Sequence, residues 1–129
     1  MPAARLGLGY SPSGVRRFMN VLGAANTTDI FMSARKFDAR EALRMGFVSK
    51  VTKVDELEKS VADYCKMVAQ NAPLTVAAAK FAVQQWQKDE QDRDLARAAQ
   101  MVATCFASED HKEGRKAFME KRIPEFKGK

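Results

Sequence analysis

Residues 55–87 read DELEKSVADYCKMVAQNAPLTVAAAKFAVQQWQ, and this stretch decides the fold because its apolar residues recur at helical spacing. The first half predicts a helix that begins at Asp55, where Asp55 and Glu58 stand as in a capping box. That helix should end near Asn71, because Pro73 disfavours helical geometry in the residue before it and suits the first turn of a new helix. The stretch therefore predicts two helices joined by a tight corner.

The second of these helices, expected over 74–87, is apolar on two flanks. Two lines of mostly apolar residues mark these flanks: Leu74, Ala78, Phe81 and Gln85 on one, and Val76, Ala79, Val83 and Trp86 on the other. Such a helix must be covered on both flanks, which indicates a middle layer or a contact with a second subunit. After the polar turn KDEQDRD, a third helix is expected over 95–107, so that three antiparallel helices precede the C-terminal segment.

The beginning of the chain has a looser pattern. LGLGYSPSG, residues 6–14, is typical of a loop, and a helix is expected after it over 15–22 with Gly23 as its stop. Two shorter helices are expected over 28–32 and 39–45.

A short strand is expected next, because FVSKVTKV, residues 47–54, is β-branched and alternates between apolar and polar residues. The fold class is therefore mainly α with a short β segment. We expect two regions, one of loops, short helices and the strand over 1–54 and one of helices over 55–129.

Composition and residue counts exclude several classes of protein. The 129 residues are 46% hydrophobic and 29% charged, as in a folded domain. Apolar runs fall short of the roughly 20 residues that cross a membrane, and a signal-peptide pattern is absent, so we expect a soluble cytoplasmic protein. Cys65 and Cys105 stand alone on apolar helical faces, which favours buried thiols over a disulfide. A single histidine without clustered ligands argues against a metal site.

The net charge of +6 is unevenly spread along the chain. Residues 1–50 hold 8 basic and 3 acidic side chains, and residues 108–129 hold 7 and 5. Two basic ends around a nearly neutral middle favour a phosphate-bearing partner, either a nucleic acid or a nucleotide-like small molecule. Charge alone does not choose between them.

The C-terminal segment, residues 108–129, reads SEDHKEGRKAFMEKRIPEFKGK and predicts a basic helix. Asp110 and Glu113 are placed to cap its start, and Pro124 is placed to end it. His111 is the chain's one candidate acid–base imidazole, but its position in the first turn favours a structural capping role.

One face of this helix combines three unlike residues, because Gly114, Phe118 and Lys121 follow one another at steps of four and three. The glycine leaves a hollow, the ring offers a stacking plane, and the ammonium can meet a phosphate. From the residues alone, a core phenylalanine among solvated lysines is the favoured interpretation.

Four segments, taken in order, resemble one family, the crotonase superfamily of enoyl-CoA hydratases and isomerases. SARKFDAREALRMGFVSKV resembles the family's F-x-A-x-E-A-x-x-x-G-L-V-x-x-V segment, NAPLTVAAAKFAV its following helix, and FASEDHKEGRKAFMEKRIPEFKG its C-terminal helix. PAARLGLGYSPSGVRRFMNVLG is similar to the segment that leads from the active-site strand into the helical half. The resemblance covers nearly the whole chain, and it implies the C-terminal, trimer-forming portion of a crotonase-like (ClpP/crotonase) α/β fold.

The resemblance also implies an activity, that of an acyl-CoA lyase or isomerase working through a thioester enolate, with a coenzyme A thioester as substrate and no cofactor. In the family, a preceding half forms a spiral of β-turns and supplies the oxyanion-hole N–H groups and a first catalytic carboxylate. Each such donor contributes about 3 kcal/mol of transition-state stabilisation. We therefore expect a C-terminal piece that is inactive by itself and that associates as a trimer or hexamer.

Residue by residue, the resemblance implies a binding role rather than a catalytic one. The glutamate of family hydratases falls at Ala3, whose methyl group cannot move a proton. Tyr10 and Ser11 stand where small residues line the family's acyl pocket, and they are candidate substrate-binding residues, although loop packing is the favoured role of Tyr10. Phe118 and Lys121 match a phenylalanine and a lysine that, in the family, reach across a subunit boundary to the adenine and phosphate end of coenzyme A.

Two other functions remain open on the sequence. One is a non-catalytic module that oligomerises or binds a partner through the two-flanked helix around Phe81 and Trp86, without affinity for coenzyme A. The other is a basic nucleic-acid-binding helical domain, whose binding would weaken steeply with salt. It ranks last because no helix shows an uninterrupted basic face with aromatic residues spaced for bases.

Overall fold

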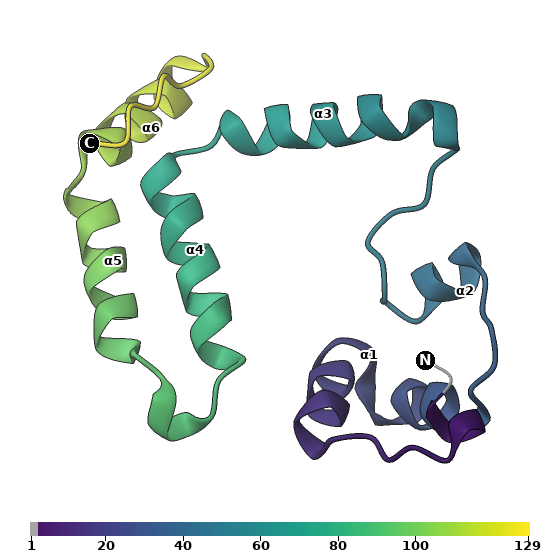
Figure 1. Ribbon diagram of the computed structural model, residues 1–129. Helices are drawn as coiled ribbons and strands as arrows, with labels where there is room; N and C mark the ends of the chain where they lie inside the picture. The colour runs from purple at the N-terminus through teal and green to yellow at the C-terminus, as the bar shows by residue number, and fades with distance from the viewer. Residues whose placement is uncertain (1–2) are drawn as a thin grey trace. The chain divides into compact units, whose positions relative to one another are not determined.

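The computed structural model describes residues 3–129, which divide into two compact units, one ending at Asp55 and one running from Glu56 to Lys129. The elements of the first unit are η1 (Ala3–Leu6), α1 (Pro12–Ser33) and α2 (Ala39–Arg44). Those of the second are α3 (Leu57–Ala69), α4 (Pro73–Trp86), η3 (Glu90–Asp92), α5 (Leu95–Ala107) and α6 (Glu109–Glu120), and the 3-10 turn η2 (Val54–Glu56) lies at the division (Figure 1). Each unit is described by itself.

The strand expected over 47–54 is wrong. Residues 3–129 form helices, turns and irregular segments, and none of them is in a strand. A strand needs a neighbour to pair its backbone N–H and C=O groups, and the described part of the chain has no second extended segment in that role. The regular elements of the described residues are therefore all helices, rather than helices with a β segment. None of these helices is both long and apolar enough to cross a bilayer.

Gly23 separates two helical stretches within α1. Its φ of 73° and ψ of 168° are non-helical, so the expected stop at Gly23 is confirmed. The second stretch begins directly after Gly23 and ends at Ser33, so it starts earlier than the expected 28–32 and ends one residue later. Two side chains just after the kink satisfy carbonyls there: Asn26 Nδ2 donates to Leu22 O at 2.9 Å and Thr27 Oγ1 donates to Gly23 O at 2.8 Å.

An aromatic cluster forms the core of the first unit. The buried members are Leu22, Ile30, Phe31 and Met45, with Tyr10, Val15, Phe18 and Phe37 packed against them. The Tyr10 and Phe31 rings stack with centroids 4.3 Å apart and planes 5° from parallel. This stacking holds the loop before α1 against the end of α1.

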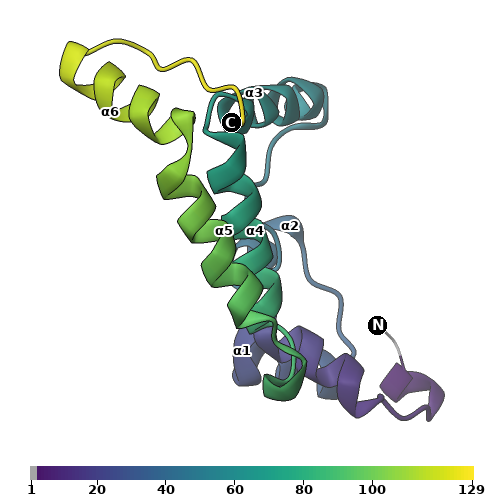
Figure 2. The same cartoon turned by 90° about the vertical axis from the view of Figure 1, so that its left-hand side faces the viewer.

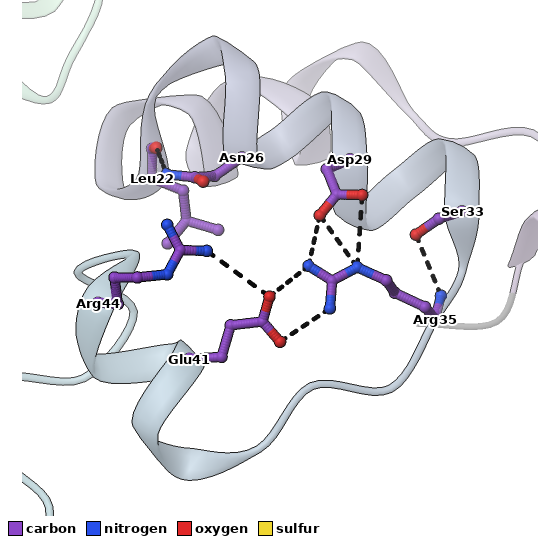
Figure 3. Close-up of polar contacts among 7 residues, drawn as sticks. All are labelled: Leu22, Asn26, Asp29, Ser33, Arg35, Glu41 and Arg44. Atoms are coloured by element: carbon purple, nitrogen blue, oxygen red, sulfur yellow. Dashed lines mark hydrogen bonds and ion pairs between the residues drawn. The ribbon is translucent and has the colours of Figure 1, made fainter.

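Arg35 links α1 to α2 through ion pairs with one carboxylate on each helix (Figure 3). Its guanidinium donates to both carboxylate oxygens of Asp29, on α1, and to both of Glu41, on α2, with Nη1 2.8 Å from Glu41 Oε2. The helix α2 itself begins as expected: Asp38 accepts from the Glu41 N–H at 2.8 Å, and Gly46, with φ of 78°, follows its end. The charged contacts thus fix the short α2 against the kinked α1.

The capping box expected at Asp55 and Glu58 is wrong. The chain enters α3 through η2, so that Glu56 takes the N-cap position with αR geometry and makes no side-chain capping bond. The end of α3 is close to expectation, since the helix stops at Ala69. Pro73 opens α4, as its fixed φ suggests.

The pair of α4 and α5 is the centre of the second unit, and the two helices run side by side in both views (Figures 1 and 2). Gln85 is buried, and its Oε1 accepts from the Asp94 N–H at 3.0 Å, which ties the end of α4 to the start of α5. By contrast, α3 runs crosswise to α4 in both views. Three antiparallel helices were expected, and only α4 and α5 have that relation.

Several apolar side chains of this unit are exposed in the single chain. Val83 and Trp86 of α4 are 59% and 63% exposed, so only one flank of the helix is covered. Cys65 is also exposed, and Cys105 is partly buried. The expectation of two buried thiols is therefore wrong for Cys65, which lies on an exposed part of α3.

Candidate functional site

Ser108 caps the start of α6. Its Oγ accepts from the His111 N–H at 3.0 Å and donates to Cys105 O at 2.7 Å, so one hydroxyl serves the start of α6 and the end of α5. The cap expected at Asp110 and Glu113 is wrong, because those carboxylates face the tail that follows the helix. His111 lies in the first turn, with its ring edge-on to Phe106 at 5.4 Å.

The tail of residues 122–129 folds back along α6 (Figure 2). The buried carboxylate of Asp110 accepts from the backbone N–H groups of Lys127 and Gly128 at 2.7 and 2.8 Å. One turn further along, Glu113 accepts two hydrogen bonds from Arg122, at 2.6 and 2.9 Å, and one from the Glu125 N–H at 2.9 Å. Two carboxylates of the helix thus hold the whole tail.

The helix α6 ends at Glu120, and its C-cap is Lys121, three residues before Pro124, the expected terminator. Lys121 has the left-handed conformation, with φ of 54° and ψ of 37°. Its N–H bonds to Phe118 O at 3.2 Å, and the Arg122 N–H bonds to Ala117 O at 3.0 Å. This pair of bonds defines a Schellman motif, which usually places glycine where Lys121 stands.

A hollow of about 670 Å³ lies among α4, α5, α6 and the tail. Its apolar lining includes Leu74, Ala78, Val102, Phe106, Phe118 and Phe126. Phe118 lines it while remaining 81% exposed, and Gly114 lies opposite Phe126, where a Cβ would come within 3.5 Å of the ring. The hollow expected at Gly114 is therefore occupied in part by the chain's own tail.

The structure brings together some of the expected site residues and separates others. Gly114 and Phe118 line the same hollow, whereas Lys121 lies past the end of the helix, outside the lining. The Lys121 side chain is exposed and makes no ion pair with residues 3–129. At the end of α6, an exposed ring and an exposed lysine without an ion pair among residues 3–129 therefore lie three residues apart in the sequence.

The remaining expected residues belong to the first unit and have local structural contacts. Ser11 caps α1, since its Oγ accepts from the Gly14 N–H at 3.2 Å. The Tyr10 hydroxyl accepts from the Ala4 N–H at 3.3 Å and donates to Phe31 O at 3.4 Å. Ala3 lies in η1 and presents a methyl group. A role of Tyr10 and Ser11 in substrate binding stays a prediction.

Three of the described carboxylates have pKa values that are shifted downward, which makes them poor candidates for acid–base catalysis near neutral pH. Hydrogen bonds from Arg35 lower the pKa of both Asp29 and Glu41 below the ordinary range. Hydrogen bonds from Arg122 lower the pKa of Glu113 to about 2. These three groups stay ionised and paired, so they act as structural anions. Within residues 3–129, no group of three or more potential ligand side chains is placed to hold a metal ion.

Sequence reasoning missed the tail as part of the site. Arg122 and Glu113 are nine residues apart, and Phe126 and Gly114 twelve, so helical spacing gives no sign of either contact. The acidic residues in the first turns of α6 are a weak signal of these contacts, but their position in the sequence equally suggests helix caps. Only a chain reversal after Lys121 brings them to the tail.

One family model matches the chain, and known proteins with similar sequences include a dehydratase and a hydratase. The family model for enoyl-CoA hydratase/isomerase matches residues 1–129, the whole chain. A carnitinyl-CoA dehydratase from Salmonella arizonae is 36% identical over 133 residues, which cover 99% of this chain and 51% of that protein. A short-chain-enoyl-CoA hydratase from Clostridium acetobutylicum is 32% identical over 119 residues, covering 91% and 46%.

Solved structures agree with the sequence matches. An enoyl-CoA hydratase from Bacillus anthracis superposes with a TM-score of 0.74 at 26% identity, over 98% of this chain and 50% of that one. The chain thus spans about half the length of the relatives it matches. Because the family model extends over every residue, the resemblance noted in the sequence is confirmed, and the chain belongs to the enoyl-CoA hydratase/isomerase family.

Proposed function

We propose that this chain is the C-terminal, coenzyme A-binding portion of a protein that acts on acyl-CoA thioesters through an enolate, without a cofactor. Family membership supports the substrate class. Ala3, at the position of the family's glutamate by resemblance, has no proton to transfer, so the reacting groups are assigned to protein outside these 129 residues. On this proposal, the chain by itself binds coenzyme A but is a poor catalyst.

The observation that carries this proposal is the exposure of Phe118. A large aromatic ring that is 81% exposed, at the rim of an apolar hollow, leaves a stacking surface in water. The exposed Lys121, which makes no ion pair within residues 3–129, follows three residues later as the C-cap of α6. A ring and a cation at this spacing suit the adenine and phosphate groups of coenzyme A, because purines stack on aromatic rings and phosphates attract ammonium groups.

Assembly into a trimer or hexamer is part of the proposal. Val83 and Trp86 leave one flank of α4 uncovered in the single chain, and an exposed apolar patch of this kind is typical of a subunit contact. A second copy would cover this flank and, as in the family, bring Phe118 and Lys121 to a neighbouring subunit's ligand.

The test is a calorimetric titration of the 129-residue chain with coenzyme A, comparing Phe118→Ala with Met119→Ala. Met119 is also 81% exposed on α6, but it is absent from the lining of the hollow, so it is a matched control. Loss of a stacking ring should weaken binding by about 5- to 30-fold, and Met119→Ala should leave it unchanged. Equal affinities for both variants would refute the proposal.

A non-catalytic assembly module is the second candidate, favoured by the same uncovered flank of α4. It predicts oligomers in sedimentation experiments together with no heat of binding for coenzyme A at any chain concentration. Saturable binding of coenzyme A that depends on Phe118 would exclude it.

A further inference from the structure

Lys121 lies at the junction between α6 and the returning tail, in a conformation that its residue type disfavours. A left-handed backbone brings Cβ close to the following carbonyl, which is why glycine is the usual residue at this position. A lysine persists there only where surrounding contacts over-determine the conformation. The contacts on both sides of Lys121 therefore decide where its side chain lies.

Glu113 supplies the charged contact beside Lys121. Its two oxygens accept from Arg122 Nη1 and Nη2, a bidentate arrangement that fixes the orientation of the residue next to Lys121. The same carboxylate accepts from the Glu125 N–H, so it also fixes the direction in which the tail leaves. The side chains of Arg122 and Glu113 are 36% and 24% exposed, so the pair is only partly shielded from water.

We propose that Glu113 is a positioning residue for coenzyme A binding: by holding Arg122 against α6, it keeps Lys121 left-handed and aims its ammonium at the phosphate end of the ligand. This rests on the proposed function of Lys121. The pairing also removes Arg122 as a competing cation, because its charge is met by Glu113 and Glu120.

Glu120 provides a matched control. It also accepts from Arg122, at 2.7 Å from Nε, but it lies only two residues away and accepts no backbone N–H of the tail in the described structure. Glu120→Gln removes the same charge from the same partner without opening the junction. Glu113→Gln keeps the shape of the side chain and an oxygen for the Glu125 N–H, and it removes the bidentate ion pair.

Two measurements on the 129-residue chain test the proposal. The first is amide hydrogen exchange of Arg122, whose N–H bonds to Ala117 O and reports the Schellman junction. Exchange should become about tenfold faster in Glu113→Gln and stay unchanged in Glu120→Gln. Unchanged exchange in Glu113→Gln would overturn the positioning role, whatever happens to ligand binding.

The second measurement is coenzyme A affinity in a double-mutant cycle with Lys121→Ala. Glu113→Gln alone should weaken binding about threefold, and it should have no further effect once Lys121 is alanine. If the double variant instead lost affinity by the product of the two single-variant factors, Glu113 would act independently of Lys121, through general stability. That result would overturn the positioning role. Unchanged affinity in Lys121→Ala alone would instead refute the binding function of Lys121, and the role of Glu113 in binding with it.

Discussion

Replacement of Lys121 by glycine should stabilise the fold and weaken ligand binding at once. The left-handed conformation costs a non-glycine residue about 1–2 kcal/mol, and glycine loses about 0.5–1 kcal/mol through its freer unfolded chain. The Lys121→Ala variant keeps the backbone strain. The free energy of unfolding of Lys121→Gly should therefore exceed that of Lys121→Ala by about 0.5–1 kcal/mol. Since both variants lack the ammonium, both should lose the contact with phosphate, worth about 1 kcal/mol or about fivefold in affinity.

Thermal unfolding and calorimetric titration of the two variants separate these effects. The melting temperature of Lys121→Gly should exceed that of Lys121→Ala by about 2–4 °C. Both should bind coenzyme A about fivefold more weakly than the unaltered chain. Full affinity in either variant would refute the role of the ammonium, and equal melting temperatures would refute the assignment of strain to Lys121.

Two further predictions concern stability. Gln85→Leu should destabilise the chain by about 1–2 kcal/mol in urea unfolding, because the Asp94 N–H loses its buried acceptor, whereas the exposed Gln84→Leu should change stability by less than about 0.5 kcal/mol. Acid should release the tail. The folded-state pKa of Glu113, about 2, lies below the ordinary 4.5, so its contribution is complete above pH 4.5 and declines as the pH falls towards 2. The chemical shift of the Glu125 amide should follow this transition; a midpoint near 4.5 would contradict it.

Local patterns were sufficient for most of the helices. Pro73 opens α4 and Gly23 interrupts α1, as proline and glycine require, and α5 has the expected bounds of Leu95–Ala107. These features depend on the backbone preferences of a few neighbouring residues. The expected strand over 47–54 does not form, because a strand depends on a distant partner rather than on its neighbours in the sequence. An alternating pattern describes one strand and gives no information about a second strand that would pair with it.

The sequence by itself determined the family, the helical course of the second unit and the surface helix that carries Phe118 and Lys121. The tertiary structure decided what those residues have as neighbours. Asp110 and Glu113 hold a returning tail rather than capping their own helix, and Phe126 fills part of the hollow beside Gly114. Contacts made across a chain reversal have no fixed spacing in the sequence, and they form only when a folded backbone brings distant residues within hydrogen-bonding distance.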